Sequence, residues 1–269
     1  MQLTKPDPRP GQTRASMSSD SVLVQLQQTL YNSRNPTRRW LHCSRRDWIS
    51  DALRSAACQG VGRTCAIEIG PGSGVYLPLQ ANLYHEVIAT DIEEDYIRHA
   101  RHVSTRHSNV SLLIDDIMSS KLPSACADLV LCTEVIEHMA DSRSAIKQMR
   151  RVLRPGGLLV LSTPRRYSPL ELAAKIAFLP GLVAPSRFIY KEPGLETGHI
   201  NLLTAPQIIR QLDEAGFEIQ QRHTSGMYLP LVAEFSGETG LRLEKWLESR
   251  LQNSPLAWLL WTQYYIARA

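Results

Sequence analysis

Residues 66–74 read Ala-Ile-Glu-Ile-Gly-Pro-Gly-Ser-Gly, a short apolar run that ends in glycines at every second position. An apolar run of this kind is typical of a strand buried in a parallel sheet. Gly70, Gly72 and Gly74 then give a loop in which a ligand can approach the main chain closely. The stretch therefore predicts the first strand and the first ligand-binding loop of an α/β sheet.

A second strand is expected at residues 87–90, and Asp91 follows it directly. The carboxyl ends of neighbouring parallel strands meet at one edge of a sheet, where a carboxylate can accept hydrogen bonds from ribose hydroxyls. Val75 occupies the position that needs the third glycine of the dinucleotide fingerprint G-x-G-x-x-G. Glu68 lies two residues before the loop, where it would repel a pyrophosphate. These departures favour a nucleoside cofactor that carries positive charge over a dinucleotide.

Further elements follow the glycine loop in a fixed order. They are a strand-like run closing on two aspartates (110–116), a strand (127–132), the segment E-V-I-E-H (134–138), a helix (144–153), and L-R-P-G-G before an apolar strand (153–162). Together they resemble class I S-adenosylmethionine-dependent methyltransferases over about residues 47–218, and the pattern is most similar to ubiquinone-pathway O-methyltransferases. The resemblance implies an enzyme with a doubly wound, seven-stranded Rossmann-like sheet, an N-terminal helical extension and a small helical cap. Its last strand is expected at residues 263–268.

The resemblance implies a role for each residue of the first two loops. Glu68 would orient the glycine loop or the methionine ammonium of S-adenosylmethionine. The three glycines would let the methionine portion lie close to the main chain. Asp91 would hold the ribose hydroxyls, with Ile92 beside the adenine.

The acidic pair after the third strand would bind the adenine amino group. Asp115 and Asp116 are both candidates, and Ile117 would pack on the ring. Asp116 is favoured because the family usually has an aliphatic residue directly after this acid.

Candidate catalytic residues are Glu137, His138 and His199. Glu134, Glu137 and His138 would share a face if a helix starts at this point. With the later His199 they resemble the metal-dependent O-methyltransferases, which include the terminal 2′-O-methyltransferases of small RNAs. The resemblance implies that these four residues bind a divalent ion such as Mg²⁺, which would polarise the acceptor hydroxyl. The alternative is a metal-free site in which the glutamate caps a helix or binds amides, and the histidines line the acceptor pocket.

The domain organisation is predicted from composition and from the extent of the resemblance. We expect a disordered leader at 1–21, an N-terminal helical extension at 22–60, and a methyltransferase domain at 61–269 with a cap insertion at 165–200. The insertion is rich in apolar residues, which suits a cap over a hydrophobic acceptor or a contact with a membrane interface. The predicted reaction is therefore methyl transfer to a small hydrophobic or aromatic acceptor, most readily at oxygen.

Composition indicates the compartment. The chain of 269 residues can bury one sizeable α/β core, and it contains no run of 18 apolar residues that could span a bilayer. Its five cysteines include no C-x-x-C pair, which favours reduced thiols. We expect a cytoplasmic protein, with peripheral membrane contact as an open alternative. The oligomeric state is not predicted by any motif.

Charge leaves two other functions open. Residues 1–60 hold nine Lys or Arg against four Asp or Glu, and several of the arginines lie beside Trp40 and Trp48. A solvated helix face is the simpler interpretation, and a patch for RNA, phosphorylated substrates or lipid head groups, or a lid over the cofactor, is the alternative. An RNA 2′-O-methyltransferase is disfavoured because the rest of the chain is slightly acidic. A non-catalytic cofactor-binding partner protein is disfavoured because the cofactor motifs and E-x-x-E-H are intact.

Overall fold

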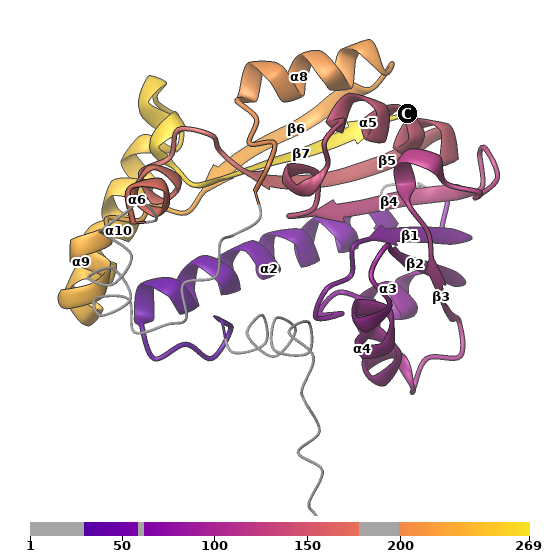
Figure 1. The fold of residues 1–269 in the computed structure, drawn as a ribbon, viewed down its shortest axis with the longest axis horizontal. Helices are drawn as coiled ribbons and strands as arrows, with labels where there is room; N and C mark the ends of the chain where they lie inside the picture. The colour runs from indigo at the N-terminus through magenta and orange to yellow at the C-terminus, as the bar shows by residue number, and fades with distance from the viewer. Residues whose placement is uncertain (1–29, 59–61, 178–198) are drawn as a thin grey trace, which may run out of the picture.

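A seven-stranded sheet with helices on both faces forms the body of the protein (Figure 1). The computed structural model describes residues 30–58, 62–177 and 199–269. The strands are β1 (Cys65–Ile69), β2 (Glu86–Asp91), β3 (Val110–Ile114), β4 (Ala127–Thr133), β5 (Leu153–Pro164), β6 (Glu218–Ser225) and β7 (Thr262–Arg268). Their order is β3-β2-β1-β4-β5-β7-β6, and β7 runs antiparallel to both of its neighbours while the other pairs are parallel. The predicted doubly wound, seven-stranded sheet is confirmed.

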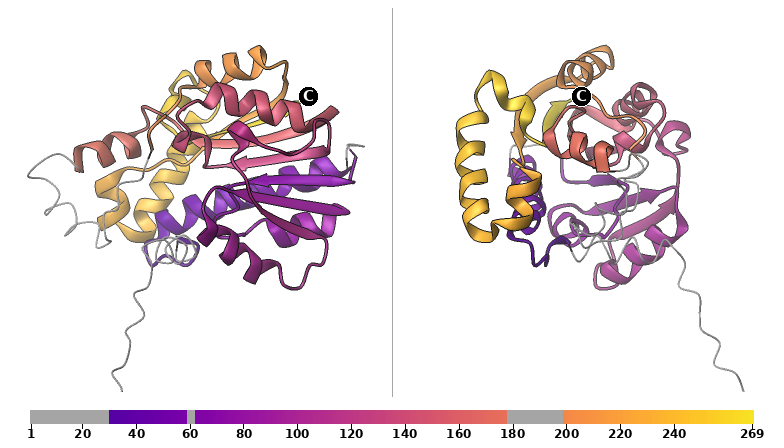
Figure 2. Two further views of the ribbon diagram at one scale, coloured as in Figure 1. Left: turned by 45° about the vertical axis from the view of Figure 1, so that its right-hand side comes forward. Right: turned by 60° about the vertical axis from the view of Figure 1, so that its left-hand side comes forward.

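Helices cover the two faces of this sheet in separate groups (Figure 2). One face is covered by α2 (Pro36–Cys58), α3 (Leu77–Leu83) and α4 (Glu94–Ser104). The other face is covered by α5 (Ser142–Val152) and α8 (Ala205–Glu214), together with the short 3-10 helix η1 (Ile117–Ser119). The arrangement buries a separate apolar layer on each side of the strands.

Strand β4 shows why both layers form. Leu129 and Leu131 belong to the layer under α2, whereas Val130 and Cys132 belong to the layer under α5. All four side chains are fully buried, because successive residues of a strand point to opposite faces and both faces are covered. A continuous apolar run is therefore what this position in the sheet requires.

Further helices pack at the end of the molecule where α2 begins. Helices α9 (Pro230–Phe235) and α10 (Gly237–Leu251) contact α2, while α6 (Pro169–Ala177) contacts α9 and the 3-10 helix η3 (Pro255–Leu259) contacts α10. Thr37 donates a hydrogen bond to Glu244, and Arg38 forms an ion pair of 2.7 Å with Glu234. Helix α2 lies within the predicted extension and α6 within the predicted cap. The predicted leader and residues 178–198 of the cap lie outside the described residues.

The strand register brings four loops to one edge of the sheet. Ile69 is aligned with Thr90 in β2 and with Cys132 in β4. The amide of Gly70 donates to the carbonyl of Thr90 at 2.8 Å, and the amide of Asp115 donates to the carbonyl of Asp91 at 3.1 Å. The loops that follow β1, β2, β3 and β4 are therefore adjacent at the carboxyl edge. Across the described ranges, no helix is both long enough and apolar enough to cross a bilayer.

Candidate cofactor and active site

A cavity of about 490 Å³ lies at this carboxyl edge. Its walls come from the loops after β1, β2, β3 and β4, from Tyr96 in α4 and from Ile200 at the end of the predicted cap. The lining residues are Ile69, Gly70, Gly72, Thr90, Asp91, Ile92, Glu93, Tyr96, Asp115, Asp116, Ile117, Met118, Glu134, Val135, His138, Met139, Ala140 and Ile200. Five of these carry a carboxylate, and none of the described lining residues is Lys or Arg. The cavity therefore favours a ligand with positive charge and disfavours a phosphate.

All three glycines of the loop after β1 have positive φ angles. Gly70, Gly72 and Gly74 have φ angles of 65°, 50° and 68°. A Cβ atom on Gly70 would lie 2.5 Å from Cγ2 of Val135, across the floor of the cavity. Gly74 faces Val103 instead, and it is not among the lining residues. The first two glycines therefore border the cavity, and the third serves the packing of the turn.

Glu68 is buried beneath the glycine loop. Its carboxyl group accepts a hydrogen bond from the amide of Gln80 on α3, and only 1% of the residue is exposed. Burial raises the pKa of Glu68 to about 8, against the opposing effect of this hydrogen bond. Glu68 does not line the cavity. Of the two predicted roles, its position is consistent with holding the loop against α3.

Asp91 ends β2 at the cavity wall. Its Oδ1 accepts a hydrogen bond from the amide of Glu93 at 3.0 Å. Burial raises the pKa of Asp91 to about 6, although this backbone hydrogen bond acts in the opposite direction. Ile92 beside it is 64% exposed, so its apolar side chain is open to a ligand.

The two aspartates after β3 differ in their hydrogen bonds. Asp116 caps η1 by accepting from the amide of Met118 at 2.9 Å. The Oδ2 atom of Asp115 is buried and has no hydrogen-bond partner within the described part of the chain. Both residues line the cavity, as does Ile117. An unsatisfied buried acceptor is costly, so Asp115 is at least as well placed as Asp116 to accept from a ligand amino group.

Glu134 begins the loop after β4 and does not share a helix face with Glu137 and His138. Its φ angle is 55°, which is uncommon for a residue with a side chain. The short helix that follows, η2 (Ile136–His138), is of the 3-10 type and starts after Glu134. The predicted common face is therefore wrong, because the chain turns sharply at the strand end instead of entering an α-helix there.

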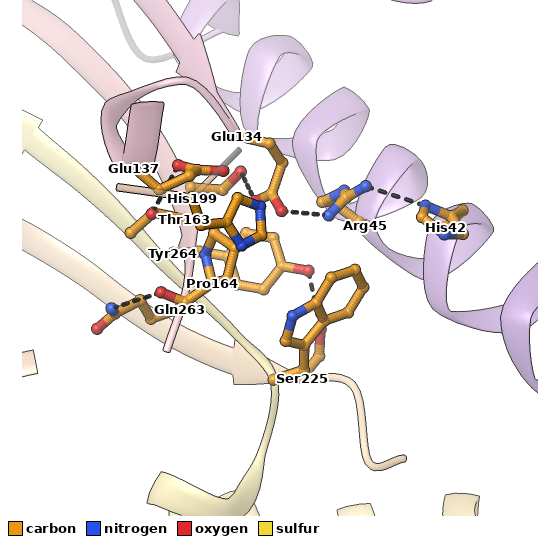
Figure 3. Close-up of polar contacts among 12 residues, drawn as sticks. His42, Arg45, Glu134, Glu137, Thr163, Pro164, His199, Ser225, Gln263 and Tyr264 are labelled. Atoms are coloured by element: carbon orange, nitrogen blue, oxygen red, sulfur yellow. Dashed lines mark hydrogen bonds and ion pairs between the residues drawn. The ribbon is translucent and has the colours of Figure 1, made fainter. Parts of the chain in front are cut away.

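The carboxylate of Glu134 is held by two other elements. Arg45 of α2 forms an ion pair of 2.5 Å with it, and the hydroxyl of Ser162 in β5 donates to it at 2.9 Å. The same guanidinium lies 3.0 Å from Nδ1 of His42, one turn earlier in α2 (Figure 3). Burial is the largest single effect and lowers the pKa of Arg45. The Glu134 carboxylate, together with Tyr264, Tyr76 and Tyr31, acts in the opposite direction, and the net pKa of Arg45 is raised.

Glu137, His138 and His199 come together beside the cavity. One candidate ligand atom from each lies within 4.8 Å of the others, and Glu134 is not a member of this described cluster. Figure 3 shows His199 beside Glu137, whose carboxylate accepts from the hydroxyl of Thr163 at 2.8 Å. The other oxygen of Glu137 is buried without a described partner. Burial, followed by the charge of Glu134, raises the pKa of Glu137 well above its ordinary value.

Arg45 and His42 are the site residues that sequence reasoning missed. The arginine-rich stretch suggested a solvated face, yet the side chains of Arg45 and Arg38 are only 11% and 12% exposed. Arg46, the next residue, is exposed and pairs with Asp47. The aromatic residues interleaved with the arginines were the one signal that part of this segment folds over the site.

Comparisons with known proteins agree with this geometry. A family model described as a methyltransferase domain matches residues 67–161. A protein of Mycolicibacterium smegmatis named a probable S-adenosylmethionine-dependent methyltransferase is 32% identical over 166 residues, which cover 60% of this chain and 56% of that protein. The chain is therefore similar to class I S-adenosylmethionine-dependent methyltransferases, and residues 67–161 match a methyltransferase domain. It spans about half the length of the first mycobacterial relatives that it matches.

One further relative and one solved structure are also similar to this chain. A ubiquinone biosynthesis O-methyltransferase of Idiomarina loihiensis is 25% identical over 155 residues, covering 56% of this chain and 60% of that protein. The crystal structure of the N-methyltransferase NodS from Bradyrhizobium japonicum, in complex with S-adenosylhomocysteine, superposes with a TM-score of 0.55. That match has 18% identity and covers 91% of this chain and 97% of NodS, so it supports the fold alone.

The residues at the methyltransferase cavity fit S-adenosylmethionine. Its ammonium and sulfonium charges suit an acidic wall without a described Lys or Arg. The unpartnered Oδ2 of Asp115 offers an acceptor for an adenine amino group. Gly70 has no Cβ atom, which would collide with Val135, so the main chain at this position stays accessible to a ligand.

Proposed function

We propose that this protein transfers a methyl group from S-adenosylmethionine to a hydroxyl oxygen of a small hydrophobic or aromatic acceptor. The observation that carries the proposal is the acid-lined cavity at the carboxyl edge, with the cluster of Glu137, His138 and His199 beside it. When bound, S-adenosylmethionine supplies an electrophilic methyl group on its sulfonium. Asp91 would hold the ribose, and Asp115 or Asp116 would hold the adenine.

The cluster would bind the acceptor and manage its proton. His138 lines the cavity itself, and its ring centroid lies 5.1 Å from that of His199. A neutral imidazole within hydrogen-bond reach of a hydroxyl can accept its proton as the oxygen attacks. We therefore assign the acceptor position to the space beside His138 and His199, with Glu137 as a further contact.

Divalent-metal assistance is the finer form of this proposal. The spacing of Glu137, His138 and His199 within 4.8 Å supports it, and two imidazoles with one carboxylate form a donor set suited to a divalent ion. Glu134 is not included, because its carboxylate is engaged by Arg45 and Ser162. Such an ion would lower the pKa of the acceptor hydroxyl.

The oxygen assignment is supported by the ubiquinone biosynthesis O-methyltransferase relatives, which match at low identity. The RNA alternative is weakened because Arg38 and Arg45 are engaged with Glu234 and Glu134 and are not available as an exposed basic patch. The cluster of Glu137, His138 and His199 beside the cavity disfavours a non-catalytic binding protein.

The test is a release assay for S-adenosylhomocysteine with separate acceptor panels. Phenols, catechols and hydroquinones with apolar tails form one panel, short RNA oligonucleotides a second, and small amines a third. Turnover with the first panel, and mass spectrometry locating the methyl group on oxygen, is expected. Activity only with RNA or only with amines would refute the acceptor class, and absence of S-adenosylmethionine binding by calorimetry would refute the enzyme. Loss of turnover in EDTA with recovery on adding Mg²⁺ would support the metal, whereas full activity in EDTA would refute it.

A further inference from the structure

Glu171 is a buried carboxylate for which the proposed function has no role so far. It lies in the first turn of α6, and only 5% of the residue is exposed. Free amide groups and the helix dipole favour negative charge at this end of a helix. A buried carboxylate still requires hydrogen-bond partners, and the identity of those partners indicates what Glu171 does.

Both oxygens of Glu171 are engaged by side chains that are distant in sequence. Oε1 accepts a hydrogen bond from the indole Nε1 of Trp261 at 3.0 Å. Oε2 lies 3.2 Å from Nδ1 of His199. Glu171 lies in the cap helix α6, His199 lies at the end of the predicted cap, and Trp261 directly precedes β7. Their side chains form one continuous chain from Trp261 through Glu171 to His199.

This contact selects one form of the His199 ring. An ionised carboxylate can only accept, so Nδ1 of His199 must carry the proton that Oε2 receives. Nε2 then has its lone pair free and remains as the atom that can serve the cluster with Glu137 and His138. Without the carboxylate, a neutral imidazole could adopt either tautomer and could rotate about its own side-chain bonds.

Trp261 is itself held in place. The guanidinium of Arg45 lies 5.3 Å from the centre of its indole ring, and the ring of His42 meets it edge-on with centroids 5.9 Å apart. Its main-chain amide donates to the carbonyl of Gly226 at 2.9 Å, and its carbonyl accepts from the amide of Arg165 at 2.7 Å. The indole N–H is therefore a fixed donor, and it fixes the carboxylate that it contacts.

We infer that Glu171 is a positioning residue which, held by Trp261, fixes the ring orientation and the tautomer of His199. The catalytic consequence rests on the proposed function, but the structural part does not. A free Nε2 lone pair is needed both by a base and by a metal ligand, so the role of Glu171 is the same in either case. Carboxylate partners of metal-binding histidines act in this way, and their loss typically lowers metal affinity or activity by about 10- to 100-fold.

The experiment compares Glu171→Gln, Trp261→Phe and the matched control Trp258→Phe. Gln keeps the size of Glu171 and an acceptor for the indole, but it can present an amide N–H to Nδ1 and so favour the opposite tautomer. Trp261→Phe removes the indole N–H donor and part of the aromatic ring. Trp258 is 47% exposed in η3, so its replacement should leave activity unchanged.

The first readout is the tautomer of His199, measured by nitrogen-15 NMR on the ligand-free full chain at pH 8.5, with His199→Asn used to assign its signals. We expect the Nδ1–H form in the wild type and a shift towards Nε2–H in Glu171→Gln. The second readout is kinetic: kcat should fall by about 10- to 100-fold in Glu171→Gln and by less in Trp261→Phe. The KM and calorimetric Kd for S-adenosylmethionine should stay within about twofold, because Glu171 does not line the cofactor cavity.

An unchanged tautomer in Glu171→Gln, or wild-type kcat in that variant, would overturn the inference. A loss of activity in Trp258→Phe equal to that in Trp261→Phe would overturn the part assigned to Trp261. If the wild type has no methyl transfer but the tautomer still shifts, the proposed function fails and the positioning role stands. The two failures are therefore distinguishable.

Discussion

Replacing Arg45 with methionine removes the cation that α2 supplies to the edge of the active site. Methionine keeps much of the apolar stem, so the main loss is the ion pair with Glu134. The carboxylate of Glu134 would keep its hydrogen bond from Ser162 but would remain largely buried without a counter-charge.

The expected loss follows from this burial. Removing one partner of a buried ion pair costs about 3–5 kcal/mol. The side chain of Glu134 is 21% exposed and keeps one hydrogen bond, so we expect the lower end, about 3 kcal/mol. In a domain of this size that corresponds to a fall in Tm of about 6–12 °C. The double variant Arg45→Met/Glu134→Gln should recover about 2 kcal/mol, because no unpaired charge is left buried.

Urea unfolding followed by circular dichroism measures these free energies at pH 7.5. Arg46→Met is the matched control, since Arg46 is adjacent and pairs with Asp47 in an exposed position. We expect this control to change stability by less than about 0.5 kcal/mol. Equal stability of the Arg45 and Arg46 variants would refute the reasoning, and so would a double variant no more stable than Arg45→Met alone.

Three other predictions concern single residues of the cofactor side. Asp91→Asn should weaken S-adenosylmethionine binding by about 1.5–3 kcal/mol in calorimetry, because charge-assisted hydrogen bonds are lost. In the wild type, the affinity for S-adenosylmethionine should fall as the pH drops below about 6, where Asp91 becomes protonated. The same pH dependence in Asp91→Asn would exclude this role. Glu68→Gln should flatten the pH dependence of stability. The pKa of Glu68 is about 8 in the folded state and 4.5 ordinarily, so the folded state holds a proton that the unfolded state has lost between these pH values. Wild-type stability should therefore fall as the pH rises through this range, by at most about 1.4 kcal/mol per pH unit. Urea unfolding at pH 5 and pH 7.5 gives the free energy of unfolding of both proteins. An equal change in this free energy between the two pH values for the wild type and for Glu68→Gln would contradict the prediction. Gly70→Ala should lower stability by about 1–3 kcal/mol, since its Cβ would lie 2.5 Å from Val135 at a positive φ angle, and a thermal melt matching the wild type would disprove the steric argument.

Prediction from sequence succeeded where the signal is local. The apolar run of β4 forms a strand that is buried on both faces, as predicted, and the glycines after β1 lie in the loop that follows that strand. The segment 134–138 is the counter-example. Its spacing is compatible with an α-helix. In the structure Glu134 instead accepts a hydrogen bond from Ser162 in the neighbouring strand β5, and a 3-10 helix starts only after it. The choice between Asp115 and Asp116 also depended on which acid caps η1.

The sequence by itself determined the sheet, its glycine loop and the family resemblance, because strand patterns and loop chemistry can be recognised from consecutive residues. Only the tertiary structure decided which distant side chains meet. Arg45 and Glu134 are 89 residues apart, and Glu171 and Trp261 are 90 residues apart. Such pairs leave no periodic trace in the chain, since each is set by how helices α2 and α6 pack against the strand ends. Burial then gives each contact its strength, because a charge away from water must find its partner inside the fold.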